Sequence, residues 1–304
     1  MATIPDAVKE VCRKTPLPER RSAHVDRRSP VAALVQRHDR DRFQTVLFAP
    51  AARREALFAL YAFNYEIARV RESVRQPLLG QIRLQWWREN IAAAFAGDPI
   101  RPHVVVEPLT RTIRERALTR AHFDRLIDAR ESDLGDDPPA TLAILEDYAE
   151  ATSARLIYLA LEILEVRDAA AHAGARHIGI AYALAGLLRA MPFRVRTGRQ
   201  PIPVEIAART GLADQDYQVL SGTPSLRAAT AELAATASRH LAAADALRSY
   251  IPPPAIPGLL PAVITRRSLA RLKRAGYNPF DPSVAGPDPL QSWRLAIAAF
   301  LHRL

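Results

Sequence analysis

The stretch Phe58-Ala59-Leu60-Tyr61-Ala62-Phe63-Asn64-Tyr65-Glu66 decides the fold class of this chain. Leu47-Phe48-Ala49-Pro50 precedes it, and Leu84-Gln85-Trp86-Trp87-Arg88-Glu89 follows it. Side chains that are three or four residues apart share one face of a helix. Here that face carries Leu57, Tyr61, Asn64, Ala68 and Glu72. The pattern predicts a helix over 51–73 that begins just after Pro50.

Nearly all of the chain from Val31 onward has the same helical pattern. Further helices are predicted over 78–96, 104–117, 120–130, 139–166, 168–190, 224–250, 255–275 and 288–303. Segments rich in proline and glycine separate them, and no convincing alternation typical of a strand is found. The sequence therefore predicts an all-α, single-domain helical bundle over 30–304, preceded by a loosely ordered leader over 1–29.

Composition and charge narrow the class of protein. The chain has 304 residues, of which 49% are hydrophobic and 24% are charged, as is ordinary for a folded globular protein. Its net charge is +10, and arginines supply nearly all of the positive charge. Because they are spread along the chain and interleaved with acids, we expect no nucleic-acid partner. A peripheral contact with an anionic membrane surface fits the charge better.

Neither a membrane span nor a secretory signal is apparent. The longest uncharged apolar run covers 178–188, well short of the roughly 20 residues that cross a bilayer. The N-terminal region lacks the features of a signal or transit peptide, and the single cysteine, Cys12, fits a reducing compartment. We expect a cytoplasmic protein, with a peripheral position on the inner membrane as a further expectation, or the matrix side if the protein is organellar.

Motifs for nucleotide binding, hydrolase nucleophiles and zinc proteases are absent from the sequence. His172 and His177 are five residues apart, which splits them around a helix, so we predict that both are solvated. Asp133, Asp136 and Asp137 lack the ligand alternation of a calcium loop. We therefore predict a solvated acidic turn there.

The segments quoted at the outset resemble the squalene/phytoene synthase family. Residues 126–134, Gly179-Ile180-Ala181 and Leu187-Leu188-Arg189 agree with that family in order and spacing, as do Gly198-Arg199, Pro203 and Glu205. The resemblance covers 31 to about 275 and implies an isoprenoid synthase fold around a central cavity. In the family, D-x-x-x-D motifs on two helices face each other and hold Mg²⁺ ions that bind and ionise an allylic diphosphate.

This chain departs from the family where the metal would bind. The first motif falls on Ala68 and Glu72, with Arg69 where a further aspartate is usual. The second falls on Ala190 and Arg194, so the four motif positions together carry no net charge. The usual glutamine and asparagine of the second motif are replaced by the residues Ala183 and Gly186. Hard cations need clustered oxygen ligands, so we predict no metal site, no cofactor, no catalytic residues and loss of the condensation reaction.

Two interpretations stay open for the residues around that position. Tyr61, Asn64 and Ala68 either pack as ordinary core or line a vestigial prenyl cavity. Five arginines lie at or beside the former metal positions, namely Arg69, Arg189, Arg194, Arg196 and Arg199. They either bind a diphosphate or lipid headgroup directly or fill the former site with salt bridges to Glu66, Glu72, Glu131 and Asp133. We favour the salt bridges, because unpaired buried charge is costly.

Residues 82–88, 187–193, 276–282, 289–290 and 292–294 resemble a non-catalytic branch of the family. That branch contains a mitochondrial assembly factor for NADH:ubiquinone oxidoreductase (complex I). The resemblance implies a degenerate enzyme that acts as an assembly or interaction factor and has a complex I subunit or assembly intermediate as its partner. The alternatives are a divergent prenyl-diphosphate condensing transferase, an isoprenoid or anionic-lipid binding protein, and a membrane-surface scaffold unrelated to respiration.

Overall fold

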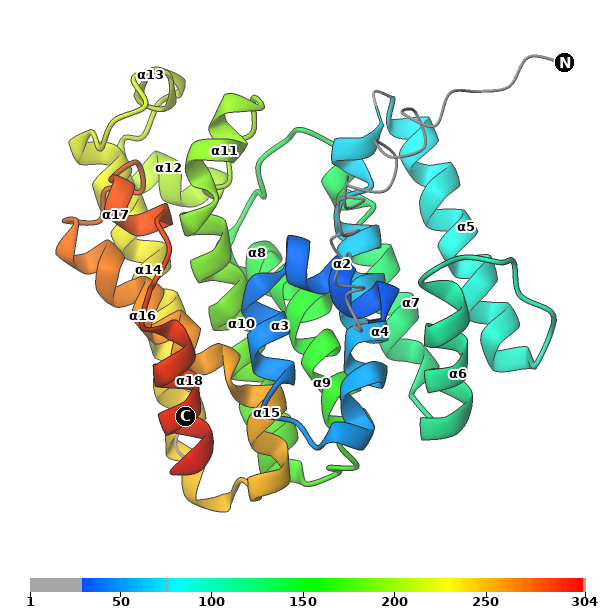
Figure 1. Ribbon diagram of the computed structural model, residues 1–304. Coiled ribbons are helices and arrows are strands. Elements are labelled where there is room, and N and C mark those ends of the chain that lie inside the picture. Colours follow the sequence, from blue (N-terminus) through cyan, green and yellow to red (C-terminus); the bar gives the residue numbers. More distant parts are fainter. Residues whose placement is uncertain (1–28, 75, 303–304) are drawn as a thin grey trace, which may run out of the picture.

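The computed structural model describes residues 29–74 and 76–302, and all regular secondary structure in these ranges is helical (Figure 1). The prediction of an all-α protein is confirmed. Apart from Ser29, the predicted leader, with Cys12 in it, lies outside the described residues. None of the described helices combines the length and the apolar character needed to span a bilayer.

The first half of the bundle contains α2 to α9. The helices are α2 (Pro30–His38), α3 (Arg40–Val46), α4 (Ala51–Ala68), α5 (Pro77–Ala96), α6 (Val106–Arg116), α7 (Arg120–Ala129), α8 (Leu142–Ala149) and α9 (Arg155–Ile163). Short 3₁₀ turns occur at η1 (Arg71–Ser73) and η2 (Ser132–Leu134), and a π-helical turn, η3 (Glu150–Ala154), joins α8 to α9.

The second half contains α10 to α18. The helices are α10 (Ala169–Arg189), α11 (Met191–Arg196), α12 (Val204–Thr210), α13 (Asp214–Gln218), α14 (Pro224–Ala246), α15 (Ile256–Leu259), α16 (Pro261–Arg274), α17 (Pro282–Ala285) and α18 (Gln291–Phe300). Two 3₁₀ turns, η4 (Arg248–Tyr250) and η5 (Pro253–Ala255), connect α14 to α15.

Polar side chains fix where several helices begin. The hydroxyl of Ser29 accepts a hydrogen bond from the backbone N–H of Ala32, and the carboxylate of Asp168 accepts one from Ala171. Thr223 caps α14 in the same way. Each cap satisfies a backbone donor that the first turn of a helix leaves free. The chain therefore enters α2, α10 and α14 at positions that the sequence specifies locally.

Helix α10 lies at the centre of the bundle and packs against α14 and α16 as well as against η3 and α9 (Figure 1). Helix α4 packs against α2, α6 and α9, and α5 to α7 form an outer group on the right of the view. One continuous hydrophobic core runs from Val31 to Val284. The facing surfaces of α4, η3 and α10 border the central pocket described below.

The close contact between α10 and η3 depends on Gly179. A Cβ atom at this position would lie 2.4 Å from the Cα of Ala154 and 2.5 Å from its backbone nitrogen. Because backbone atoms cannot yield as a flexible side chain can, only glycine lets the two segments approach this closely. The contact holds the π-helical turn against the central helix.

Several predicted helix boundaries are wrong. The helix predicted over 139–166 is divided into α8, η3 and α9, and the one predicted over 224–250 ends at Ala246. Two further errors have a local reason. The helix predicted over 51–73 ends at Ala68, and 71–73 forms a separate 3₁₀ turn in which the hydroxyl of Ser73 donates to the carbonyl of Val70. The same carbonyl also accepts from the backbone N–H of Ser73, and such a local side-chain bond competes with continuation of the α-helix. The helix predicted over 255–275 is interrupted before Pro261, which has no backbone N–H to continue the hydrogen-bond pattern.

Candidate functional site

A pocket of about 250 Å³ opens between α4, α10 and η3, and we call it the central pocket. Many elements far apart in the sequence contribute to its wall. The lining residues are His38, Asp39, Arg42, Asn64, Tyr65, Ala68, Arg130, Tyr148, Thr152, Ser153, Tyr182, Ala183, Gly186, Leu187, Ala190 and Arg194. Asn64, Ala68, Ala183, Gly186, Ala190 and Arg194, all singled out from the sequence, lie together on this wall.

Small residues provide part of the space in the central pocket. Ala68 lies on α4, and Ala183 and Gly186 lie on α10. A Cβ added at Gly186 would meet no heavy atom within 4 Å, so this part of the wall is open. Larger side chains at these positions would project into the volume that the pocket now holds.

Arg42 is the first of two largely buried arginines on the wall. Its Nη1 lies 2.6 Å from Oδ2 of Asp39, and its guanidinium carbon lies 5.0 Å from the ring centre of Tyr182 and 5.7 Å from that of Tyr61. Burial acts to lower the pKa of Arg42, but Asp39 together with Tyr182 and Tyr61 outweighs burial and the pKa is raised. Arg42 therefore keeps its charge inside the protein.

Arg130 is the second. Its Nη1 lies 3.1 Å from Oδ2 of Asp133 and donates to the hydroxyl of Tyr148 over 2.9 Å, and that hydroxyl donates to Oδ1 of Asp133 over 2.8 Å. Burial raises the pKa of Tyr148 to about 12, which keeps the hydroxyl protonated as a donor. Burial acts to lower the pKa of Arg130, yet Tyr148 and Asp133 raise it above its ordinary value. The three side chains form one closed network.

The charges on the wall oppose the binding of divalent cations. Arg42, Arg130 and Arg194 face a single carboxylate, that of Asp39, among the described wall residues, and Arg42 pairs with it. No group of three His, Cys, Asp or Glu side chains placed to hold a metal ion is found within 29–74 and 76–302. Hard cations such as Mg²⁺ require several oxygen ligands, so the donor set of the central pocket does not fit Mg²⁺. Arg42 and Arg130 are already paired with Asp39 and Asp133, so Arg194 supplies the remaining positive charge of this wall.

Three buried polar atoms at the central pocket have no hydrogen-bond partner within the described parts of the chain. They are Oδ1 of Asn64, Oγ of Ser153 and Nε of Arg130. Buried polar atoms in folded proteins nearly always bond to protein, to water or to a ligand.

Tyr61 and Glu72, two other residues singled out from the sequence, do not line the central pocket. Tyr61 is buried behind the wall, where its ring faces Arg42 and burial raises its pKa to about 12. Glu72 is exposed and lies in the 3₁₀ turn after α4. Helix α4 ends at Ala68, so Glu72 does not continue the helix face of Asn64 and Ala68.

The five arginines singled out from the sequence do not converge on one point. Arg194 reaches the central pocket, and with Arg199 it also lines an adjacent pocket of about 160 Å³. The side chain of Arg199 donates to the backbone carbonyl of Asp133 over 2.6 Å. Arg189 pairs with Asp41 at 2.9 Å, and Arg196 is exposed on α11.

The proposed filling by salt bridges is seen only in part. Arg69 pairs with Glu66 at 3.6 Å and donates to the hydroxyl of Tyr65. Glu131 pairs instead with Arg88 on α5, at 2.8 Å. The carboxylate of Asp133 pairs with Arg130, which was not among the five. Glu131 and Asp133 therefore form ion pairs with arginines outside the five that the sequence singled out.

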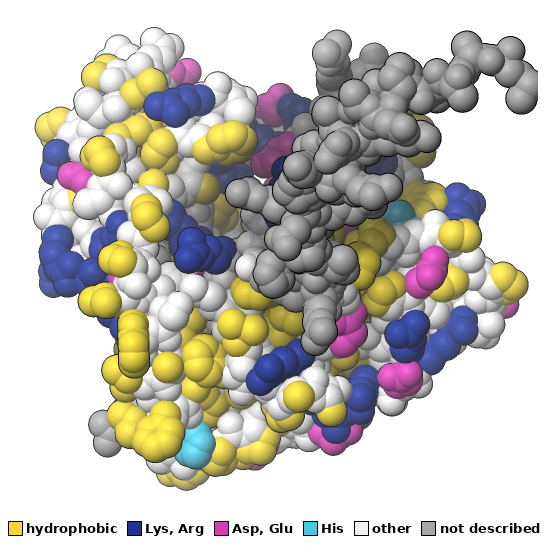
Figure 2. All heavy atoms as spheres, viewed as in Figure 1, with side chains coloured by type: hydrophobic (Ala, Val, Ile, Leu, Met, Phe, Trp, Pro, Cys, Tyr) yellow, Lys and Arg dark blue, Asp and Glu magenta, His cyan; other side chains and the backbone are white. Residues whose placement is uncertain are grey.

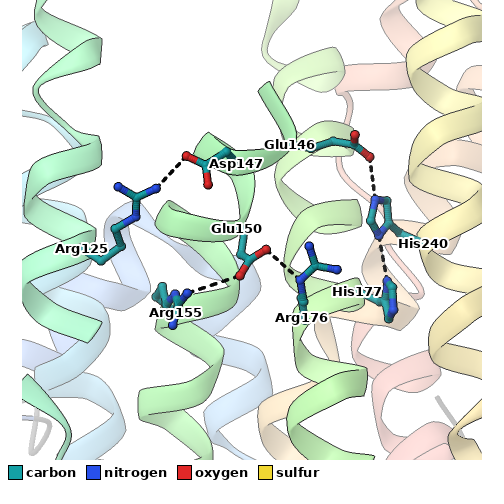
Figure 3. A network of polar contacts seen from close by, with 8 residues as sticks. All are labelled: Arg125, Glu146, Asp147, Glu150, Arg155, Arg176, His177 and His240. Atoms are coloured by element: carbon teal, nitrogen blue, oxygen red, sulfur yellow. Dashed lines mark hydrogen bonds and ion pairs between the residues drawn. The ribbon is translucent and has the colours of Figure 1, made fainter. Parts of the chain in front are cut away.

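The predictions for the two histidines and the acidic turn need correction. His172 and His177 are partly buried, because α9 and α14 cover this length of α10: His172 stacks on Tyr158 with ring centres 5.3 Å apart, and His177 bonds to His240 (Figure 3). In the acidic turn Asp133 is held by Tyr148 and Arg130. Asp136 and Asp137 are exposed, as predicted.

Sequence reasoning missed Asp39, Arg42, Arg130, Tyr148 and Tyr182. None of them belongs to the motifs that hold metal in the family, and the contacts of Arg42 with Tyr182 and of Arg130 with Tyr148 join separate elements. A signal was present for Arg130, which stands three residues before Asp133 in a segment already singled out. Arg42 likewise stands three residues after its partner Asp39, but its ring contacts come from α4 and α10 and have no local signal.

Comparisons with known proteins agree with this architecture. Complex I assembly factor 6 of Bos taurus is 31% identical over 268 residues, which cover 86% of this chain and 80% of the relative. Presqualene diphosphate synthase of Rhodopseudomonas palustris is 28% identical over 204 residues, covering 67% and 72%. The crystal structure of squalene synthase HpnC from Alicyclobacillus acidocaldarius superposes with a TM-score of 0.73 at 23% identity, covering 82% of this chain and 94% of the other.

The isoprenoid synthase fold expected from the sequence is thus confirmed. The family model for squalene/phytoene synthase matches residues 35–299. The chain belongs to the squalene/phytoene synthase family.

Proposed function

We propose that this protein is an assembly or interaction factor for respiratory complex I and that it does not catalyse the metal-dependent condensation of its enzymatic relatives. The observation that carries the proposal is the wall of the central pocket, where Arg42, Arg130 and Arg194 face one paired carboxylate. Relatives of about 30% identity over most of the chain are complex I assembly factors, which supports the role.

Chemistry argues against condensation at this wall. Ionising an allylic diphosphate requires that the leaving group be neutralised as it departs, which metal ions do by bridging its oxygens. Ala68 and Ala190 supply no ligand for such ions. Arg42 and Arg130 are each engaged by a carboxylate, so they contribute little additional positive charge to a leaving group.

In this proposal the predicted site residues have a structural role. Tyr61, Asn64 and the small residues on the wall shape a pocket inherited from an enzymatic ancestor, and residues 30–304 act as one domain. The partner is a complex I subunit or assembly intermediate, and the protein works at the cytoplasmic or matrix face of the membrane that holds the complex.

Deletion of the gene tests the assembly role. In the deleted strain we expect less assembled complex I on native gels and a matching loss of NADH:quinone activity in membranes, both restored by the wild-type gene. A variant with Ala68→Leu and Ala190→Leu fills the central pocket and should also restore assembly, provided that it accumulates normally. Unchanged complex I in the deleted strain would contradict the proposal.

A divergent prenyl-diphosphate condensing transferase is the second candidate. The open central pocket and the similarity to presqualene diphosphate synthase favour it. It predicts release of inorganic diphosphate from farnesyl or geranylgeranyl diphosphate in the presence of Mg²⁺, abolished by EDTA. We expect no such release from the purified chain. Turnover that needs metal and falls in the pocket-filling variant would replace the first proposal with this one.

A further inference from the structure

Helix α18 has two apolar faces, and the bundle covers one of them. Leu295 and Ala298 are buried in a small hydrophobic cluster, where they pack with Ile256 of α15, Ile264 of α16 and Leu260 between these helices. A surface helix of a globular protein normally carries polar residues on the face opposite its buried one. The outer face of α18 breaks this rule.

The outer face presents large apolar side chains to solvent. Trp293 is 71% exposed, Ile297 56%, Phe300 84% and Leu301 50%. Their spacing of three and four residues places them along one side of the helix. Figure 2 shows hydrophobic side chains gathered over α18, with Lys and Arg side chains above them on the same face. A contiguous exposed apolar patch of this kind marks an interaction surface.

Basic residues lie along one side of this patch. Helices α16 and α18 together carry six basic residues and no acid, and these are Arg266, Arg267, Arg271, Lys273, Arg274 and Arg294. A groove of about 530 Å³ between the two helices has an apolar floor that includes Val263, Ile297 and Leu301. Arg266, Arg267 and Arg294 also line it.

Neighbouring acids neutralise only part of this charge. Asp245 pairs with Arg266, and Asp288 pairs with both Arg267 and Arg294. Two carboxylates therefore serve three guanidinium groups at the groove. Burial acts to raise the pKa of Asp288, but hydrogen bonds to its carboxylate outweigh burial and lower the pKa, so it stays ionised. The surface keeps an excess of positive charge beside exposed aromatic and aliphatic side chains.

We propose that the outer face of α18 docks on a bilayer surface that contains anionic phospholipids. Trp293 and Phe300 enter the boundary between headgroups and acyl chains, and the arginines of the groove contact lipid phosphates. This combination of an apolar face with flanking cations is typical of helices that lie in a membrane interface. The guanidinium groups of the groove can bind the phosphate of a phospholipid headgroup, and its apolar floor can contact the first carbons of the acyl chains.

A second apolar patch, beside which Arg101 is paired with an acid, serves as the comparison. On α5, Leu78 is 62% exposed and Ile82 is 57% exposed. The shallow pocket beside them is lined by Arg101 and by Glu89, which pair at 3.5 Å. The two patches expose similar apolar side chains but differ in the charge around them. A comparison of the two patches therefore distinguishes binding to a charged bilayer from nonspecific hydrophobic adsorption.

The test is co-flotation of the full-length chain with vesicles of phosphatidylcholine alone or mixed with phosphatidylglycerol. We expect binding to the mixed vesicles only, and loss of most of it between about 0.05 and 0.5 M salt because ions screen the cationic surface. A variant with Trp293→Gln and Phe300→Gln should bind at least about tenfold more weakly. The matched variant with Leu78→Gln and Ile82→Gln should bind like the wild type.

Both pairs of residues are exposed, so unchanged circular dichroism and thermal midpoints will show that the variants fold. Equal binding to neutral vesicles, or equal loss in the two variants, would overturn the proposal. So would a wild-type dimer that the α18 variant converts to a monomer while vesicle binding is unchanged, because a second copy of the chain would then cover this face. Light scattering on the same samples measures this.

Discussion

The imidazole rings of His177 and His240 meet across the packed helices α10 and α14, with their Nδ1 atoms 2.9 Å apart (Figure 3). His240 continues the contact through Nε2 to the carboxylate of Glu146 on α8, over 2.8 Å. Since a hydrogen bond between two Nδ1 atoms needs one donor and one acceptor, at least one of the rings must be neutral. These contacts join three helices, so protonation of the histidines affects how the helices are held together.

Stability should therefore decrease in mild acid. Burial lowers the pKa of His177 from its ordinary value of 6.5, and His240 and Arg176 lower it further, whereas Glu150 opposes them. Burial also lowers the pKa of His122. As the pH falls below about 6.5, these histidines bind protons in the unfolded chain but stay neutral in the folded chain. The free energy of unfolding is therefore highest above about pH 6.5 and decreases as the pH falls below it.

The measurement is urea unfolding at several pH values between about 5 and 7.5. His177→Asn should flatten the slope by up to about 1 kcal/mol per pH unit over its window. His302→Asn, at an exposed position, is the control and should leave the slope unchanged. A wild-type stability that rises on acidification would show that the sign is wrong.

Two glycines on α10 should respond to the same substitution in opposite ways. Gly179→Ala places a methyl group against the backbone of Ala154, so we expect a loss of at least about 2 kcal/mol in the free energy of unfolding. Gly186→Ala meets open space and replaces a flexible helical residue, so a gain of about 1 kcal/mol is expected. Chemical denaturation of both variants checks this, and equal effects would show that the contact with η3 is not as tight as described.

Asp133→Asn should strongly destabilise the protein. It leaves Arg130 partly buried and without its carboxylate partner, and breaking such a pair costs about 3 kcal/mol. The double variant with Arg130→Met removes the stranded charge and should recover much of the loss. Asp136→Asn removes only the exposed partner of Arg71, so it should be close to neutral. If Asp133→Asn is also neutral in urea unfolding, the network with Tyr148 is not important for stability.

Restoring the acidic motif should not restore a strong metal site. We expect the triple variant Ala68→Asp, Ala190→Asp and Arg194→Asp to bind Mg²⁺ weakly at most, because Arg42 and Arg130 compete for the new carboxylates. Adding Arg42→Gln removes one competitor and frees Asp39, so binding should strengthen. Titration calorimetry compares the two variants. Tight binding by the triple variant alone would mean that the arginines do not control the electrostatics of the pocket.

The sequence predicts local features of this structure better than long-range contacts. Helical periodicity and proline boundaries depend on neighbours in the chain, so the long helices were predicted well. The breaks near Ser73, Glu150–Ala154 and Pro261 and the short helices α11 to α13 were not predicted. The small residues on the pocket wall also followed from the family motifs. The pairing of Arg42 with rings from α4 and α10 depends on the tertiary arrangement, which no local pattern encodes.

The same limit explains the misplaced ion pairs. The sequence shows that arginines and acids are both present, but which of them meet depends on how the helices pack. Glu131 faces Arg88 on α5 rather than an arginine near α10, and Arg189 faces Asp41 on α3. Exposed charges on long side chains have several partners within reach, and small differences in packing decide among them.

The π-helical turn at Glu150–Ala154 also sets the rotational register of everything that follows it. Successive residues of a regular helix are rotated by about 100°, so deleting one residue here would turn the apolar side of α9 away from α4 by about that angle. Thr152 and Ser153 would leave the pocket at the same time. A lineage that lost this single residue would have to repack its interior, so the irregular turn is difficult to remove by a single deletion.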